Sequence, residues 1–194
     1  QAAADNDRVT IEVRSEDSGD AADSRRARFA GSREPQRFAR WLQGQFPGVL
    51  LEGEPVVRVL PSRDPTVIEV KGSISRAALQ STGGVPVFPG ELDWKASSVP
   101  GGTRHGPMMV AVQPDLEWTM DVDLGRPPQQ LPPSSELETE FGTLLIDFSG
   151  ADSGYRVEGS LRLVPGLVDA AAVSGLRDFL VTVERRLSRT LELP

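Results

Sequence analysis

The chain has 194 residues, of which 38% are hydrophobic and 25% charged, a composition typical of a globular protein. Its formal net charge of −7 argues against binding to nucleic acid or to an anionic membrane surface, since both need clustered lysine and arginine. It contains no cysteine, which excludes disulfides, thiolate nucleophiles and cysteine-ligated metals.

The first part of the chain predicts strands on either side of a helix. Residues 7–14 alternate apolar and polar side chains with the period of a half-buried strand, and we expect this strand to end in the turn-forming run 16–20. Residues 34–46 predict an amphipathic helix that Pro47 and Gly48 terminate, with Phe38, Trp41, Leu42 and Phe46 on its apolar face.

Two further strands are expected at 49–60 and 66–75. The next segment, 80–107, is rich in glycine and proline, so we expect only short strands there, at 85–88 and 91–96, on long loops. A subdomain boundary is predicted near the end of this segment. It divides the chain into an α+β linking subdomain, 1–103, and a C-terminal β-sandwich-like subdomain with a terminal helix, 104–194.

The second half begins with an apolar run, 108–112, that is typical of a strand buried on both faces. Polar and apolar side chains alternate over 117–124, which predicts a half-buried strand. Residues 136–149 and 155–164 predict the two strands of a hairpin.

The last long element is a helix over about 169–188, with Asp169 as its N-cap. Its apolar stripe consists of Val173, Leu176, Leu180, Val183 and Leu187, with Phe179 beside it. Residues 191–193 are suited to a final edge strand. These elements predict a mainly β (α+β) fold, in which antiparallel β-sandwich-type sheets pack against two amphipathic helices, 34–46 and 169–188.

Residues that can perform catalysis are few. His105 is the only histidine and lies in a glycine-rich loop, without a G-x-S-x-G motif or a phosphate-binding loop to accompany it. Asp121 and Asp123 share one face of a predicted strand and are the candidate pair for glycosidase chemistry, but a solvated outer face follows directly from the alternation and is the interpretation we favour. An acidic group, Glu16, Asp17, Asp20 and Asp23, lacks the regular spacing of a calcium loop. We therefore predict no catalytic residues, no metal and no cofactor.

Tryptophan supplies the remaining candidates for binding. Trp41 and Trp118 lie on apolar faces and are expected in the core. Trp94 lies in the loop-rich middle, where an exposed indole can stack on a sugar or anchor a protein partner. Trp94 and His105 are the candidate binding surface.

Several segments, in their order along the chain, resemble the region that follows the core in bacterial transglutaminase-like proteins flanked by β-rich domains of unknown function. The segments that carry this resemblance are 46–48 (FPG), 118–124 (WTMDVDL), 131–132 (LP), 141–142 (FG), 155–164 (YRVEGSLRLV) and 176–180 (LRDFL). One departure is the approach to the last helix, where residues 168–173 (VDAAAV) replace a proline-and-aromatic pattern.

The resemblance implies a non-catalytic region, because the family's Cys, His and Asp belong to the core domain and this chain has no cysteine. It implies an accessory, scaffolding or protein-interaction role in a larger transglutaminase-like protein, whose core or another protein is the partner. It also implies a periplasmic or cell-envelope setting. Separately, the chain begins at Gln1 without signal-peptide features, which we interpret as a boundary made by processing or by excision of the segment from a longer protein, and no apolar stretch approaches the ~20 residues of a membrane span. The alternative is a carbohydrate or envelope-polymer binding module that uses Trp94, and an independent carboxylate hydrolase is the third hypothesis.

Overall fold

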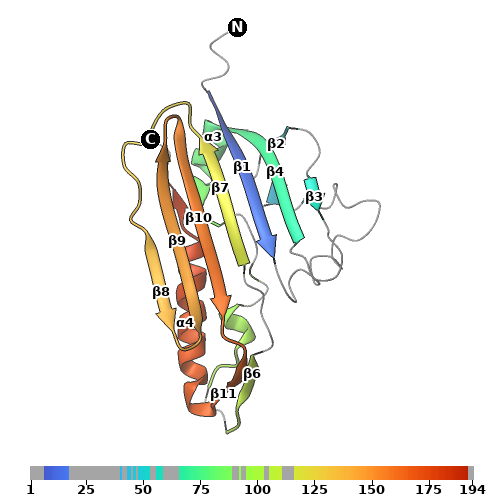
Figure 1. The fold of residues 1–194 in the computed structure, drawn as a ribbon, viewed down its shortest axis with the longest axis vertical. Helices are drawn as coiled ribbons and strands as arrows, with labels where there is room; N and C mark the ends of the chain where they lie inside the picture. The colour runs from blue at the N-terminus through green and yellow to red at the C-terminus, as the bar shows by residue number, and fades with distance from the viewer. Residues whose placement is uncertain are drawn as a thin grey trace.

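The computed structural model describes residues 7–17, 40, 43–44, 46, 48–52, 56–58, 66–88, 92, 95–102, 105–110 and 116–191. Its main feature is an antiparallel eight-stranded sheet with the strand order β2-β4-β1-β7-β10-β9-β8, in which β3 also pairs with β4 (Figure 1). The strands are β1 (Arg8–Asp17), β2 (Leu50–Leu51), β3 (Val56–Arg58), β4 (Thr66–Ser75), β7 (Leu116–Asp123), β8 (Ser135–Thr139), β9 (Gly142–Ala151) and β10 (Gly154–Leu163). The predicted mainly β fold is confirmed.

Shorter elements complete the described chain. Two small antiparallel ribbons pair β5 (Val85–Pro86) with β12 (Thr190–Leu191) and β6 (Met108–Val110) with β11 (Gly166–Val168). The helical elements are α3 (Arg76–Ser81), α4 (Val173–Leu187) and the 3₁₀ turns η2 (Ala96–Ser98) and η3 (Ala170–Ala172).

One face of the sheet, called here the inner face, is a continuous apolar surface. Directly opposed residues of neighbouring strands form rows of side chains across this face. One row runs from Val13 through Met120 and Val157 to Phe148. These side chains lie on one face because alternate residues of a strand point the same way and directly opposed residues stand together. The alternation predicted for 7–14 and 117–124 is therefore what builds the core.

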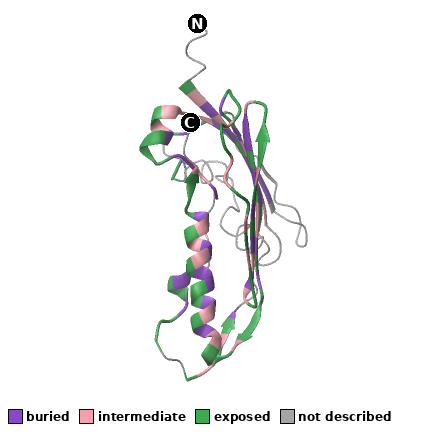
Figure 2. Ribbon diagram, turned by 90° about the vertical axis from the view of Figure 1, so that its left-hand side faces the viewer, coloured by how far each residue is buried: buried purple, intermediate pink, exposed green. Residues whose placement is uncertain are grey.

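Helix α4 lies against the inner face behind β9 and β10, as Figure 1 shows from the front and Figure 2 with the sheet nearly edge-on. Its buried side chains are Val173, Leu176, Phe179, Leu180, Val183 and Leu187, which confirms the predicted stripe. A β-sandwich needs a second large sheet opposite the first. Among the described residues, the layer opposite the large sheet is instead α4 with short segments.

Trp118 and Glu184 fix the loop-rich middle of the chain to this core. The indole Nε1 of Trp118 donates to the carbonyl of Val87 at 3.2 Å, and its ring meets Phe88 edge-on with the centroids 5.0 Å apart. The Glu184 carboxylate of α4 accepts from the backbone N–H of Ala96 at 2.6 Å, at the start of η2. Burial of Trp118 confirms its predicted place in the core.

Several predicted boundaries are wrong in the N-terminal part. Strand β1 continues through Asp17, because its ladder with β4 reaches Thr66, so Glu16 and Asp17 extend the strand instead of starting a turn. In the segment 49–60 the structure describes only β2 and β3 as strand. Of the predicted helix 34–46, residues 40, 43 and 44 are helical and most of the rest lies outside the described residues.

The predicted hairpin is also wrong in its first arm. Segment 136–149 is two strands, β8 and β9, joined at Glu140 and Phe141. The Thr139 hydroxyl accepts from the N–H of Phe141 at 3.2 Å, and this side-chain bond stabilises the turn. At the turn exit a Cβ on Gly142 would clash with the carbonyl of Arg162, so only glycine allows β9 and β10 to approach this closely.

Helix α4 begins later than predicted. Residues 170–172 form the 3₁₀ turn η3, closed by a 2.9 Å bond from the N–H of Ala172 to the carbonyl of Asp169. Asp169 precedes that turn, but its side chain makes no capping hydrogen bond. At the other end, Thr190 and Leu191 form the edge strand β12, while residues 192–194 lie outside the described part of the chain.

The eight-stranded sheet joins both sides of the subdomain boundary predicted at 103/104. Strand β1 pairs with β4 on one side and with β7 on the other, and its ladder with β7 runs from Thr10 to Asp17. The two halves therefore share backbone hydrogen bonds, and the division at 103/104 stays a prediction.

Candidate functional site

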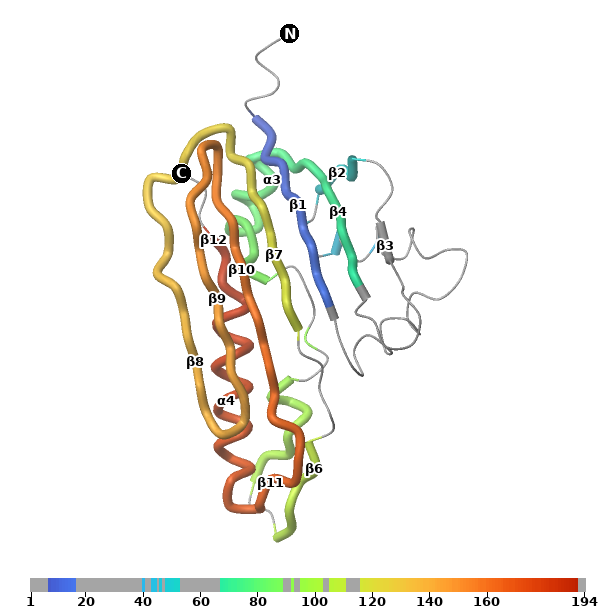
Figure 3. Tube along the Cα trace, in the orientation of Figure 1, coloured from blue at the N-terminus to red at the C-terminus, as the bar shows by residue number. Residues whose placement is uncertain are grey.

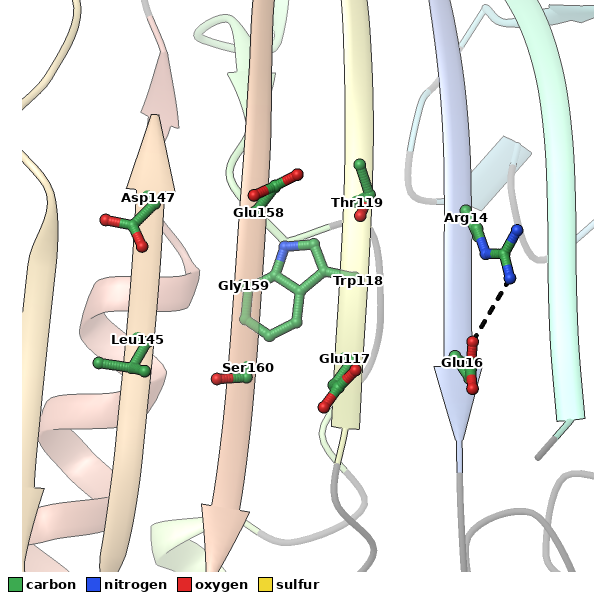
Figure 4. A pocket seen from close by; sticks show the side chains of 10 residues that line it. All are labelled: Arg14, Glu16, Glu117, Trp118, Thr119, Leu145, Asp147, Glu158, Gly159 and Ser160. Atoms are coloured by element: carbon green, nitrogen blue, oxygen red, sulfur yellow. Dashed lines mark hydrogen bonds and ion pairs between the residues drawn. The ribbon is translucent and has the colours of Figure 1, made fainter. Parts of the chain in front are cut away.

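The face of the sheet opposite α4, called here the outer face, carries a shallow depression of about 290 Å³. Side chains from four adjacent strands line it, as Figure 4 shows: Arg14, Glu16, Glu117, Thr119, Leu145, Asp147, Glu158 and Ser160. Four of these are carboxylates and one is a guanidinium, so the depression attracts cations more than anions. Arg14 is already held by Glu16 at 3.5 Å and by Glu69 at 3.1 Å.

The predicted carboxylate pair lies on the same face but is engaged in other bonds. Arg156 grips Asp121 with two hydrogen bonds of 2.6 and 2.9 Å, and this bond to Asp121 raises the pKa of Arg156, which stays charged. Asp123 accepts from the backbone N–H of Gly125 at 2.8 Å and so shapes the turn after β7. Asp121 therefore links β7 to β10, and Asp123 stabilises the turn that follows β7.

The acidic group predicted from sequence is only partly described, since Asp20 and Asp23 lie outside the described residues. Within the described part of the chain, no group of three or more histidine, aspartate or glutamate side chains is arranged to hold a metal ion.

Tyr155 is the one described side chain with a buried polar atom that has no hydrogen-bond partner, its hydroxyl oxygen. It lies on the inner face between Val122 of β7 and Gly150 of β9. Burial raises the pKa of this phenol, because an ionised oxygen loses its hydration there. This hydroxyl remains protonated at neutral pH.

Among the described residues, the two most exposed large apolar side chains belong to the ribbon of β6 and β11. This ribbon lies at the end of the molecule where α4 begins (Figures 1 and 3). Met109 is 64% exposed and Leu167 61%, and the two are directly opposed across the ribbon. Directly opposed residues place their side chains on the same face, so they form one apolar surface, called here the ribbon tip. Val164, just before β11, is 51% exposed.

The ribbon tip corrects the prediction that 108–112 is a strand buried on both faces. Within the described residues, which leave out 111 and 112, strand β6 (Met108–Val110) pairs with β11, and Val110 is buried while Met109 faces solvent. An apolar run favours a buried strand, so the sequence gives no signal of this exposure.

Of the predicted binding surface, His105 is described and Trp94 is not. His105 is exposed and precedes β6 by three residues. Trp94 and Trp41 lie outside the described residues. The candidate binding surface of Trp94 and His105 therefore stays a prediction.

Comparison with known protein families, with curated proteins and with solved structures finds no match for this chain. No helix in the described segments is both long and apolar enough to cross a membrane. Function is therefore inferred from the surfaces themselves.

Proposed function

We propose that this chain is a non-catalytic accessory region that docks onto another protein domain through the ribbon tip. The observation that supports the proposal is the cross-strand pair of Met109 and Leu167, each more than half exposed. Adjacent large apolar side chains in water are a recurrent mark of protein interfaces. Methionine also adapts its shape to a partner surface at little cost.

The partner we propose is a transglutaminase-like core, in a periplasmic or cell-envelope setting, as the sequence resemblance implies. The ribbon tip suits such a contact because it projects beyond the large sheet, at the end away from the C-terminus (Figure 1). A domain docked there leaves both the outer face and the far end of α4 accessible.

The test has two stages. The coding sequence upstream of residue 1 is read first, and a core with Cys, His and Asp in order is expected. That core is then produced separately and titrated with this chain by calorimetry. Replacing Met109 and Leu167 together by lysine is expected to weaken binding by at least about tenfold, because two apolar contacts become buried charges.

Val181→Lys is the matched control, since Val181 is an exposed apolar residue on α4, away from the ribbon. Equal binding by the ribbon variant and the control would contradict docking through the tip. Peptide hydrolysis or cross-linking by the isolated chain, abolished by His105→Ala, would contradict the non-catalytic role.

A further inference from the structure

A second, unlike surface lies at the opposite end of α4. A cavity of about 230 Å³ opens between the last turn of this helix, the inner side of β9 and the segment that leads into β8. Its apolar wall includes Val87, Ile146, Phe148 and Leu191, and its polar wall includes Arg186 and Arg189.

The apolar wall is firmly held. Val87 and Ile146 are each only 2% exposed. The backbone N–H of Val87 donates to the carbonyl of Arg189 at 3.0 Å, and the Val87 carbonyl accepts from Trp118 at 3.2 Å. The cavity is therefore formed by the fold itself and does not need a ligand to shape it.

The polar wall carries two cations. Arg186 donates through Nη1 to the Ser135 hydroxyl at 2.8 Å and to the Glu136 carbonyl at 2.7 Å, so its guanidinium is fixed in place. Arg189 is exposed, just past the helix end. Within the described residues neither guanidinium forms an ion pair with a carboxylate. An apolar cavity edged by two cations that no described carboxylate neutralises is complementary to an apolar anion.

We propose that this cavity binds a carboxylate that carries a compact apolar group, with the carboxylate at Arg186 and Arg189 and the apolar group against Ile146 and Phe148. The size agrees: an apolar protein cavity of about 150 Å³ holds benzene, so one of this size accepts a phenyl ring with a short acid chain. A free organic acid and the C-terminal residue of a peptide both present this chemistry. The inference does not depend on docking at the ribbon tip.

The experiment is a titration of the ¹⁵N-labelled chain, followed by NMR, with 3-phenylpropanoate and with its neutral amide. The acid is expected to shift the amides of Val87, Ile146, Phe148 and Leu191 and to bind about tenfold or more tightly than the amide. N-acetyl-L-phenylalanine distinguishes the sources: tighter binding than phenylpropanoate assigns the site to a peptide C-terminus, and weaker binding assigns it to a free acid.

Arg189→Gln is the decisive variant, because this side chain is exposed and its loss leaves the cavity walls intact. It is expected to reduce the affinity for the acid about tenfold and to leave the affinity for the amide unchanged. Arg185→Gln, in the last turn of α4 but outside the cavity lining, is the matched control and is expected to bind like the wild type. Equal affinity for acid and amide, no effect of Arg189→Gln, or no shift at these amides up to about 10 mM ligand would overturn the proposal.

Discussion

The two faces of the eight-stranded sheet belong to the same strands but are stabilised by different interactions. On the inner face, Val13, Met120 and Val157 are almost fully buried. On the outer face, no described element covers the strands, and exposed ion pairs such as Arg156–Asp121 and Arg14–Glu69 link them (Figure 2). Apolar burial contributes far more free energy than exposed ion pairs do, so stability is concentrated on one face. Substitutions on the outer face are therefore expected to change stability less than substitutions on the inner face.

The largest effect is expected where the helix meets the inner face. Leu180 is 1% exposed, and Leu180→Ala is expected to lower the free energy of unfolding by about 2–5 kcal/mol, because the variant loses buried apolar surface and leaves a cavity. Leu176→Ala is expected to behave in the same way. A urea melt measures both.

The adjacent residue provides the control. Val181 points outward from the same helix, so Val181→Ala is expected to change the free energy of unfolding by no more than about 0.5 kcal/mol. A Leu180→Ala melt that superimposes on the melt of Val181→Ala would mean that α4 does not pack on the sheet as described.

Tyr155 is an exception on the apolar inner face, because it carries a buried hydroxyl. A buried hydroxyl without a partner is unfavourable, so Tyr155→Phe is expected to raise the free energy of unfolding at neutral pH, by about 1 kcal/mol. The wild type is also expected to become less stable as the pH rises above 10.0, the usual pKa of tyrosine, because the unfolded chain then releases a proton that the folded chain retains. The variant lacks that dependence at this position.

Tyr155 is the only tyrosine, so absorbance at 295 nm reports its ionisation without interference from other tyrosines. In the folded chain, tyrosinate should form well above pH 10.0 or only as the protein unfolds. Titration of this phenol near its usual pKa, with the fold intact, would show that the side chain is accessible to water.

The sequence predicts the elements whose periodicity is long and regular. The strand expected at 66–75 coincides with β4, and the stripe from Val173 to Leu187 is the buried face of α4. The turn at Glu140 and Phe141 is missed because neither residue is typical of tight turns, and the need for Gly142 arises only from the approach of Arg162.

The two proposed binding surfaces could not be predicted from the sequence. The ribbon tip depends on which strand pairs with β6, and the cavity depends on Val87, Ile146 and Arg189 meeting from three distant parts of the chain. Local patterns carry no information on such encounters. The predicted surface residues His105 and Trp94 rest on residue type and on their position in loops, and of these the structure describes only His105.

The smallest effect is expected on the outer face. Asp121→Asn removes the ion pair with Arg156, in which both side chains are nearly half exposed, and is expected to cost about 0.2–1 kcal/mol. Arg156→Gln is expected to cost a similar amount, and the double variant less than the sum of the two, because both single changes break the same pair. Raising the salt concentration to about 1 M should reduce the coupling, since the charges are screened by solvent ions. A coupling of several kcal/mol that persists in high salt would place this pair in a buried environment, which would imply that another layer covers the outer face in solution.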